Sequence, residues 1–119
     1  MKQIKSEDIA DIVVAALEEL KALNIQVLDV ASLTSITDIM IIASGRSNRQ
    51  VKALSDKVRE KVKEAGITVL GTEGEQDAEW ILVDIGDVIV HIMQPATRTY
   101  YQLEKLWSVD KAIKDESSF

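Results

Sequence analysis

The amino-acid sequence predicts a single α/β domain in which a mixed five-stranded sheet is flanked by three helices. Of the 119 residues, 46% are hydrophobic and 29% are charged, which is typical of a globular chain with one core. Apolar residues recur at helical and strand spacings in the order helix, two strands, helix, three strands, helix. We expect the domain to span residues 1–107, followed by a flexible tail over 108–119.

The first helix is predicted to begin at Ser6, a residue that can cap a helix, with two acids in the first turn. Its apolar stripe runs from Ile9 to Leu20, and Asn24 is a plausible stop. Two strands follow, over residues 25–30 and 36–44. The second is apolar on both faces near its end, which indicates a strand inside the sheet with both faces covered.

The second helix is predicted over residues 48–65. Ser47 and Gln50 form a capping box at its start, and Gly66 lies where glycine commonly follows a helix. A third strand is expected over residues 67–71. A strand–helix–strand unit of this length predicts a right-handed parallel crossover.

A polar loop over residues 72–79 precedes the last strands. These are predicted over residues 80–84 and 88–93, joined by a short hairpin. Pro95 is expected to end the sheet, and a third helix is predicted from Thr97. The apolar set of that helix is Tyr100, Tyr101, Leu103, Leu106 and Trp107.

The net charge of −6 is unevenly distributed along the chain. Residues 46–63 carry seven basic and two acidic side chains, whereas residues 64–97 carry seven acids and no lysine or arginine. An acidic segment cannot release counterions from a phosphate backbone, so it is a poor surface for nucleic acid. It suits a basic protein partner instead. The alternative is a solvated loop that only aids solubility.

The sequence argues against several kinds of functional site and against a membrane or secreted location. The absence of cysteine excludes disulfides, thiolate metal sites and a cysteine nucleophile. His91 is the only histidine, which leaves too few ligands for a polyhistidine metal site. No apolar stretch approaches the roughly 20 residues that span a bilayer. The N-terminus lacks the apolar region of a signal peptide, so we expect a cytoplasmic protein without membrane contact.

The turn Ser44-Gly45-Arg46-Ser47 is a candidate phosphate site because it joins a buried strand to a helix N-terminus. Free amides, Arg46 and a hydroxyl can hold an anion there. The turn carries neither the dinucleotide-binding nor the P-loop glycine pattern. A capped strand–helix turn is the alternative interpretation, and it is the one we favour.

Asp84 and Asp87 flank the predicted hairpin and form a candidate magnesium pair. Aspartate and glycine are also ordinary hairpin residues, and a third ligand is not evident, so we interpret them as turn residues. His91 is predicted to share a strand face with Ile89 and Met93. A lone histidine there is more often structural or interfacial than catalytic. We therefore expect no catalytic residue, no metal and no cofactor.

Five motifs together resemble the Iojap family of ribosomal silencing factors. They are Ile36-Thr37-Asp38, Gly45-x-Ser47, Glu73-Gly74 with Glu79-Trp80, Asp84-x-Gly86-Asp87-Val88-x-Val90-His91, and Tyr101-x-Leu103-Glu104-x-Leu106-Trp107. The similarity extends from the first helix to Trp107. It implies a nucleotidyltransferase-like fold. The related transferases carry Asp-x-Asp on the strand after the glycine–serine turn, and the absence of that motif here argues against transferase activity.

The resemblance also implies a function. It implies a non-enzymatic repressor of translation that binds the free large ribosomal subunit through its basic protein number fourteen. The bound factor would sterically block joining of the small subunit. Family members tend to form homodimers, which an exposed sheet edge can support. The alternatives are a nucleotide or phosphate binder at Ser44–Ser47 and a dimeric adaptor for another basic partner.

The resemblance implies that Trp80 is the aromatic anchor of the partner-binding face. Spacing does not decide whether Trp107 contacts the partner or the sheet, and the basic second helix can reach ribosomal RNA. The residues expected on or beside the partner-binding face are Glu73, Glu75, Asp77, Glu79, Trp80, Asp84, Asp87, His91, Tyr101 and Trp107.

Overall fold

The computed structural model describes residues 4–102. In this range a single five-stranded sheet has the strand order β1-β2-β5-β4-β3, and β2 and β5 are its one parallel pair. The predicted mixed α/β fold with three helices is confirmed. The elements in chain order are α1 (Ser6–Glu19), β1 (Leu23–Asp29), β2 (Ile39–Ser44), α2 (Asn48–Glu64), β3 (Gly71–Glu73), β4 (Trp80–Asp84), β5 (Val88–Met93) and α3 (Pro95–Tyr101).

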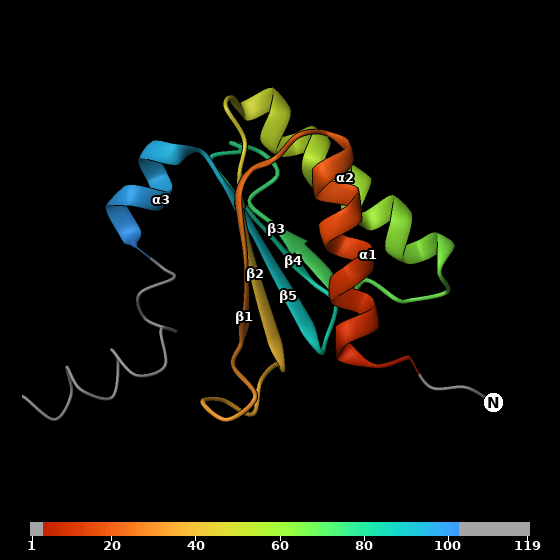
Figure 1. Ribbon diagram of the computed structural model, residues 1–119. Helices are drawn as coiled ribbons and strands as arrows, with labels where there is room; N and C mark the ends of the chain where they lie inside the picture. Colours follow the sequence, from red (N-terminus) through yellow and green to blue (C-terminus); the bar gives the residue numbers. More distant parts are fainter. Residues whose placement is uncertain (1–3, 103–119) are drawn as a thin grey trace, which may run out of the picture.

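The two long helices lie together on one face of the sheet, and α3 lies on the other side near one end (Figure 1). The main core is formed where the apolar stripes of α1 and α2 meet this face. Leu17 and Leu54 from the helices and Ile41, Val83 and Val90 from the strands are completely buried there. Among residues 4–102, no helix combines the length and hydropathy needed to cross a membrane.

The start of α1 differs from the prediction. Lys5, not Ser6, is the N-cap residue, and its backbone N–H donates to the Asp8 carboxylate at 3.3 Å. The Ser6 hydroxyl instead donates to Asp38 at 2.7 Å and ties the helix to the segment before β2. Asn24 was also wrong as the helix stop, because it lies within β1 with a φ of 47°.

The cap of α2 confirms the predicted start of that helix. The Ser47 hydroxyl accepts the backbone N–H of Gln50 at 3.1 Å. The Gln50 side chain accepts the N–H of Arg46 at 2.6 Å, one residue earlier than a capping box requires. Gly66 follows the helix end with a φ of 81°, as predicted from its position.

The predicted third strand is wrong in its bounds and its neighbours. Residues 67–70 precede the strand, and β3 begins at Gly71, where pairing with the end of β4 starts. β3 runs in the same direction as β2, but β5 and β4 lie between them, so the parallel neighbour of β2 is β5.

The starts of β2 and α3 also differ from the predictions. β2 begins at Ile39 rather than at residue 36, and the Ile36 side chain is 77% exposed. α3 begins at Pro95, two residues before Thr97, because proline is favoured at the first position of a helix. The predicted apolar positions Leu103, Leu106 and Trp107 lie outside the described residues.

Candidate functional site

The side of the sheet opposite α1 and α2 carries a second, smaller apolar cluster. Val30, Met40, Ile42 and Met93 are buried in it, and Leu28 and Trp80 pack against it as half-buried neighbours. Strand alternation adds Leu82, Asp84, Ile89 and His91 to the same side. We call this surface the Trp80 face: Leu28, Met40, Ile42, Trp80, Leu82, Asp84, Ile89, His91 and Met93.

Trp80 and His91 form a hydrogen-bonded pair across the neighbouring strands β4 and β5. The indole Nε1–H donates to His91 Nδ1 at 2.9 Å, and the ring centroids lie 5.8 Å apart. His91 is only 6% exposed, and burial lowers its pKa to about 4. The imidazole is therefore neutral at physiological pH, with Nδ1 as acceptor. The pair fixes the orientation of the indole on the face.

Two tyrosines of α3 extend this aromatic group. The Tyr101 ring lies 5.0 Å from Trp80, and the Tyr100 ring packs edge-on against Tyr101 at 4.9 Å. Tyr100 and Tyr101 are 80% and 54% exposed, so these two members of the predicted apolar set are not buried in the core. The structure thus brings together three predicted site residues: Trp80, His91 and Tyr101. The fourth aromatic candidate, Trp107, lies outside the described residues.

The acidic loop does not present all its carboxylates to the same side. Glu73 lies opposite Leu82 in the β3–β4 pairing and is therefore on the side of the Trp80 face. Glu75 forms an ion pair with Arg59 of α2 at 3.1 Å, on the helix side. Between them, Gly74 has a φ of 88°, and a Cβ there would lie 2.1 Å from the Trp80 carbonyl oxygen. Glycine at this position lets the loop turn tightly against the backbone of Trp80.

The other two acids of the loop are exposed, and their backbone carbonyl groups attach the loop to the start of α2 and to the residue that follows β5. The Asp77 carbonyl oxygen accepts from the Asn48 side chain at 3.0 Å, and the Glu79 carbonyl oxygen accepts the N–H of Gln94 at 3.1 Å. These bonds engage backbone oxygens, so both carboxylates remain on the surface.

Part of the positive charge of α2 is neutralised within the fold. Lys57 lies 3.4 Å from Glu19, and its pKa is raised by Glu19 and then by Glu60. Arg59 contacts Asp56 as well as Glu75. Three exposed cations near the start of the helix have no ion pair within residues 4–102: Arg46, Arg49 and Lys52.

The hairpin acids behave as turn residues. The Asp84 carboxylate accepts the N–H of Gly86 at 2.9 Å, and Gly86 has a φ of 92°. The Asp87 carbonyl oxygen accepts the N–H groups of Asp38 and Ile39 at 3.0 and 3.1 Å, while its side chain is exposed. Within residues 4–102, no three His, Cys, Asp or Glu side chains gather as metal ligands would.

The Ser44–Ser47 turn uses several of its polar groups internally. Ser47 caps α2, and the Arg46 N–H is bound by Gln50. A Cβ on Gly45 would lie 3.0 Å from both the nitrogen and the Cγ2 of Val51, so glycine lets the strand approach the helix closely. This geometry fits the capped strand–helix turn that we favoured.

Two polar contacts were missed by sequence reasoning. The Trp80–His91 bond joins residues 11 apart in the sequence, and the Arg98–Ser44 bond joins residues 54 apart at 3.0 Å. Arg98 is 7% exposed, although it lies in a short surface helix. No local pattern signals either pair, because both depend on how strands and helices meet.

Comparisons with known proteins match nearly the whole chain. The family model described as ribosomal silencing factor during starvation matches residues 3–118. A ribosomal silencing factor from Chromobacterium violaceum is 50% identical over 105 residues, covering 88% of this chain and 86% of that protein. A crystal structure of a protein from the same organism matches with a TM-score of 0.86 and 49% identity, covering 87% of each chain.

The chain is also similar to a eukaryotic protein whose name refers to the ribosomal large subunit. The mouse protein named mitochondrial assembly of ribosomal large subunit protein 1 is 33% identical over 102 residues. The match covers 83% of this chain and 45% of that longer protein.

Proposed function

The chain belongs to the family of ribosomal silencing factors, and we propose that it represses translation by binding the large ribosomal subunit and blocking its joining to the small subunit. The names of the bacterial relatives support a role in silencing. The name of the mouse relative supports the large subunit as the partner. We place this activity in the cytoplasm, where free bacterial subunits are found.

The Trp80 face is the docking surface in this proposal, and the Trp80–His91 pair is the observation that carries it. An indole that is half-buried and oriented by a hydrogen bond of 2.9 Å is a preorganised anchor. Aromatic anchors of this kind contribute strongly to binding, because little conformational freedom is lost when they dock. Tyr101 and Leu82 supply apolar area beside it.

Charge complementarity supports a basic ribosomal protein, number fourteen of the large subunit, as the direct partner. Glu73 and Asp84 lie on the side of the Trp80 face, and the side chains of Asp77, Glu79 and Asp87 are exposed. Acids at the rim of an apolar contact steer a basic partner and favour its correct orientation. Glu75 contributes less, because Arg59 already neutralises it.

In this proposal the protein acts as a steric plug and not as an enzyme. Subunit joining requires close approach of two large surfaces, so a domain bound on one of them is sufficient to prevent it. The internal hydrogen bonds of the Ser44–Ser47 turn support this view over nucleotide transfer at that turn.

Two further contacts complete the proposal. We propose that Arg46, Arg49 and Lys52, which are exposed at the start of α2, contact ribosomal RNA phosphates beside the docked protein. The free edge of β1, where Val27 is 49% exposed, is the proposed pairing edge of a homodimer.

Co-sedimentation with purified large subunits tests the docking surface. Trp80→Ala should weaken binding by about 2 kcal/mol, which is roughly 30-fold, because it removes the central anchor. The matched control is Ile36→Ala, which also truncates an exposed apolar side chain but lies outside the face and should bind normally. Equal binding by both variants, with unchanged melting temperatures, would remove the Trp80 face from the proposal.

A further inference from the structure

Asn48, the first residue of α2, is hydrogen-bonded to two distant segments through its side-chain amide. Its Nδ2 donates to the Asp77 carbonyl oxygen at 3.0 Å, and its Oδ1 accepts from the Gln94 side chain. The partners are 29 and 46 residues away in the sequence. A backbone carbonyl group only accepts, so Asp77 determines the orientation of the amide. One side chain therefore joins the start of α2 to the acidic loop and to the junction between β5 and α3.

These bonds belong to a closed network beside the aromatic anchor. The Gln94 backbone N–H donates to the Glu79 carbonyl oxygen at 3.1 Å. The Gln94 side chain donates to Asn48, and Asn48 donates to Asp77, so the network closes through the loop itself. Trp80 follows Glu79 directly as the first residue of β4, and its partner in the sheet is the residue before Gln94. The network therefore constrains the backbone from which the indole projects.

The acidic loop needs such attachments because part of its backbone is unfavourable. Ala78 is 4% exposed and has a φ of 58°, which is left-handed backbone at a residue other than glycine. Such backbone costs free energy and persists where the surrounding contacts hold it. Asn48 bonds to the residue immediately before it. The ion pair between Arg59 and Glu75 is a second attachment to α2, but partly exposed ion pairs contribute little.

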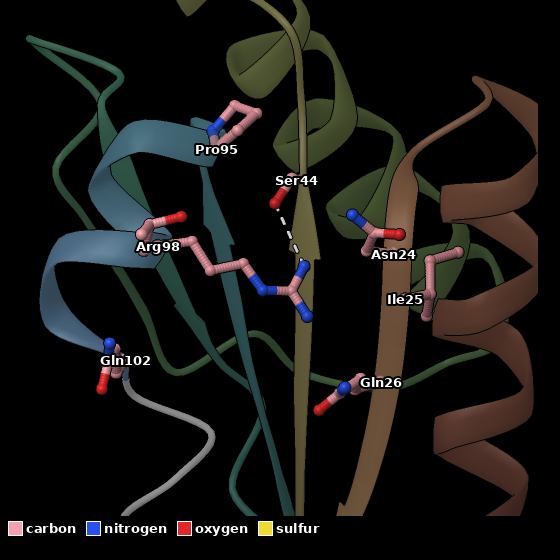
Figure 2. A pocket seen from close by; sticks show the side chains of 8 residues that line it. Asn24, Ile25, Gln26, Ser44, Pro95, Arg98 and Gln102 are labelled. Carbon is pink, nitrogen blue, oxygen red and sulfur yellow. Dashed lines mark hydrogen bonds between the residues drawn. The ribbon is translucent and has the colours of Figure 1, made fainter.

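The same bonds fix the start of α3. Gln94 is the N-cap residue of this helix, and its carbonyl oxygen accepts the Arg98 N–H at 3.0 Å. Tyr101, at the end of the helix, packs its ring on the indole of the Trp80 face. Figure 2 shows the Arg98 side chain extending from α3 over β2 to Ser44, and this bond of 3.0 Å holds the helix at a second point. Loss of the Asn48 bonds should therefore shift α3 without detaching it.

We propose that Asn48 is a positioning residue for docking. Its amide holds the acidic loop and the start of α3 in the arrangement that sets Trp80 and Tyr101 beside each other on the docking surface. The inference rests on the proposed function, in which the Trp80 face is that surface. Asn48 acts through Asp77 and Gln94, which lead directly into β4 and α3. Its side chain is exposed, so its bonds contribute modestly to stability, and their main effect is on the geometry of the face.

Asn48→Asp separates this role from a contribution to stability. The carboxylate keeps an oxygen for the Gln94 side chain but turns a second oxygen, in place of the NH₂ donor, toward the Asp77 carbonyl group. The first turn of α2 contains no acid, so a negative charge there interacts favourably with the helix dipole. We expect an unchanged or slightly higher melting temperature and about fivefold weaker co-sedimentation with purified large subunits. Docking equal to that of the parent protein would overturn the proposal.

Ser47→Asp is the matched control, because it adds the same charge one residue earlier. Aspartate at the cap retains an acceptor for the Gln50 N–H and leaves the bonds of Asn48 intact, so this variant should dock like the parent protein. Equal weakening by both variants would assign the effect to charge near the cations of α2 and would refute the role of Asn48. Normal docking by Trp80→Ala would remove the Trp80 face and this role with it, whereas normal docking by Asn48→Asp alone removes only the role.

Hydrogen exchange of the free full-length protein, followed by NMR, gives a readout that does not depend on the ribosome. The N–H groups of Ala78 and Gln94 should exchange several-fold faster in Asn48→Asp than in Ser47→Asp. The indole N–H signal of Trp80 should shift in Asn48→Asp alone. Equal exchange rates and the same indole signal in both variants would contradict the proposal, because the loop and the start of α3 would then not depend on the amide.

Discussion

The two sides of the sheet are built from the same strands but differ in chemistry. The side under α1 and α2 is aliphatic, and residues such as Leu54, Val83 and Val90 are completely buried there. The Trp80 face has a smaller buried centre, and a hydrogen-bonded Trp–His pair and carboxylates lie beside it. Water is excluded from the first side, whereas the indole of Trp80 on the second side is held in a fixed orientation and stays partly accessible to solvent. We therefore expect the first side to contribute most of the stability, and the second side is the one we propose for docking.

The largest expected effect is on stability. Leu54→Ala, on the helix-covered side, should lower the free energy of unfolding by about 2–5 kcal/mol, because it leaves a cavity in a fully buried site. Leu82→Ala, on the half-buried Trp80 face, should cost about 1 kcal/mol. Urea denaturation measures both. Equal losses would show that the two sides contribute alike to the core.

Acid should destabilise the protein through His91. Its folded pKa of about 4 lies below the ordinary value of 6.5, so the unfolded chain binds more protons between these pH values. The free energy of unfolding should therefore fall as pH drops from 6.5 to 4, by up to about 3 kcal/mol. His91→Asn keeps an acceptor for the indole without titrating in this range. If its pH profile matched that of the parent, the assignment to His91 would be wrong.

A smaller effect is expected at the cap of α2, away from both sides of the sheet. Ser47→Ala removes the acceptor for the Gln50 N–H and should cost about 1 kcal/mol. Ser47→Asp retains an acceptor and should restore most of the loss. Thermal unfolding followed by circular dichroism distinguishes the two variants, and an unchanged midpoint in Ser47→Ala would show that the bond contributes nothing.

The smallest expected effect is on the rate of association, and it compares an acid on the side of the Trp80 face with an acid on the helix side. Glu73→Gln, on the side of the Trp80 face, should slow association with the large subunit a few-fold and reduce its salt dependence. Glu75→Gln, whose carboxylate is paired with Arg59, should change the rate less. Stopped-flow association at two salt concentrations measures both rates. The steering role of Glu73 would be refuted if both substitutions slowed association equally.

Local sequence signals were sufficient for several elements. The bounds of β4 and β5 agree with the prediction, because each is an apolar run bounded by a polar loop, hairpin or proline. The start of α2 also agrees, because Ser47 is a strong cap. The predicted face of His91 follows from strand alternation alone, and Met93 lies on it.

The remaining features depend on contacts between distant residues. The start of β3 is determined by where it meets the end of β4, which no local run of residues specifies. The separation of Glu73 from Glu75 follows from the left-handed backbone at Gly74. The Trp80–His91 bond requires the β4–β5 register, in which Trp80 lies opposite Met93 and His91 lies opposite Leu82. These features define the surface that we propose for docking.

Subunit joining, followed by light scattering, tests the central claim most directly. Purified large subunits are incubated with the protein or with Trp80→Ala, and small subunits are then added. We expect the parent protein to suppress joining and Trp80→Ala to need roughly 30-fold higher concentration for the same suppression. Normal joining of large subunits saturated with the parent protein, or equal suppression by the folded variant, would contradict the account.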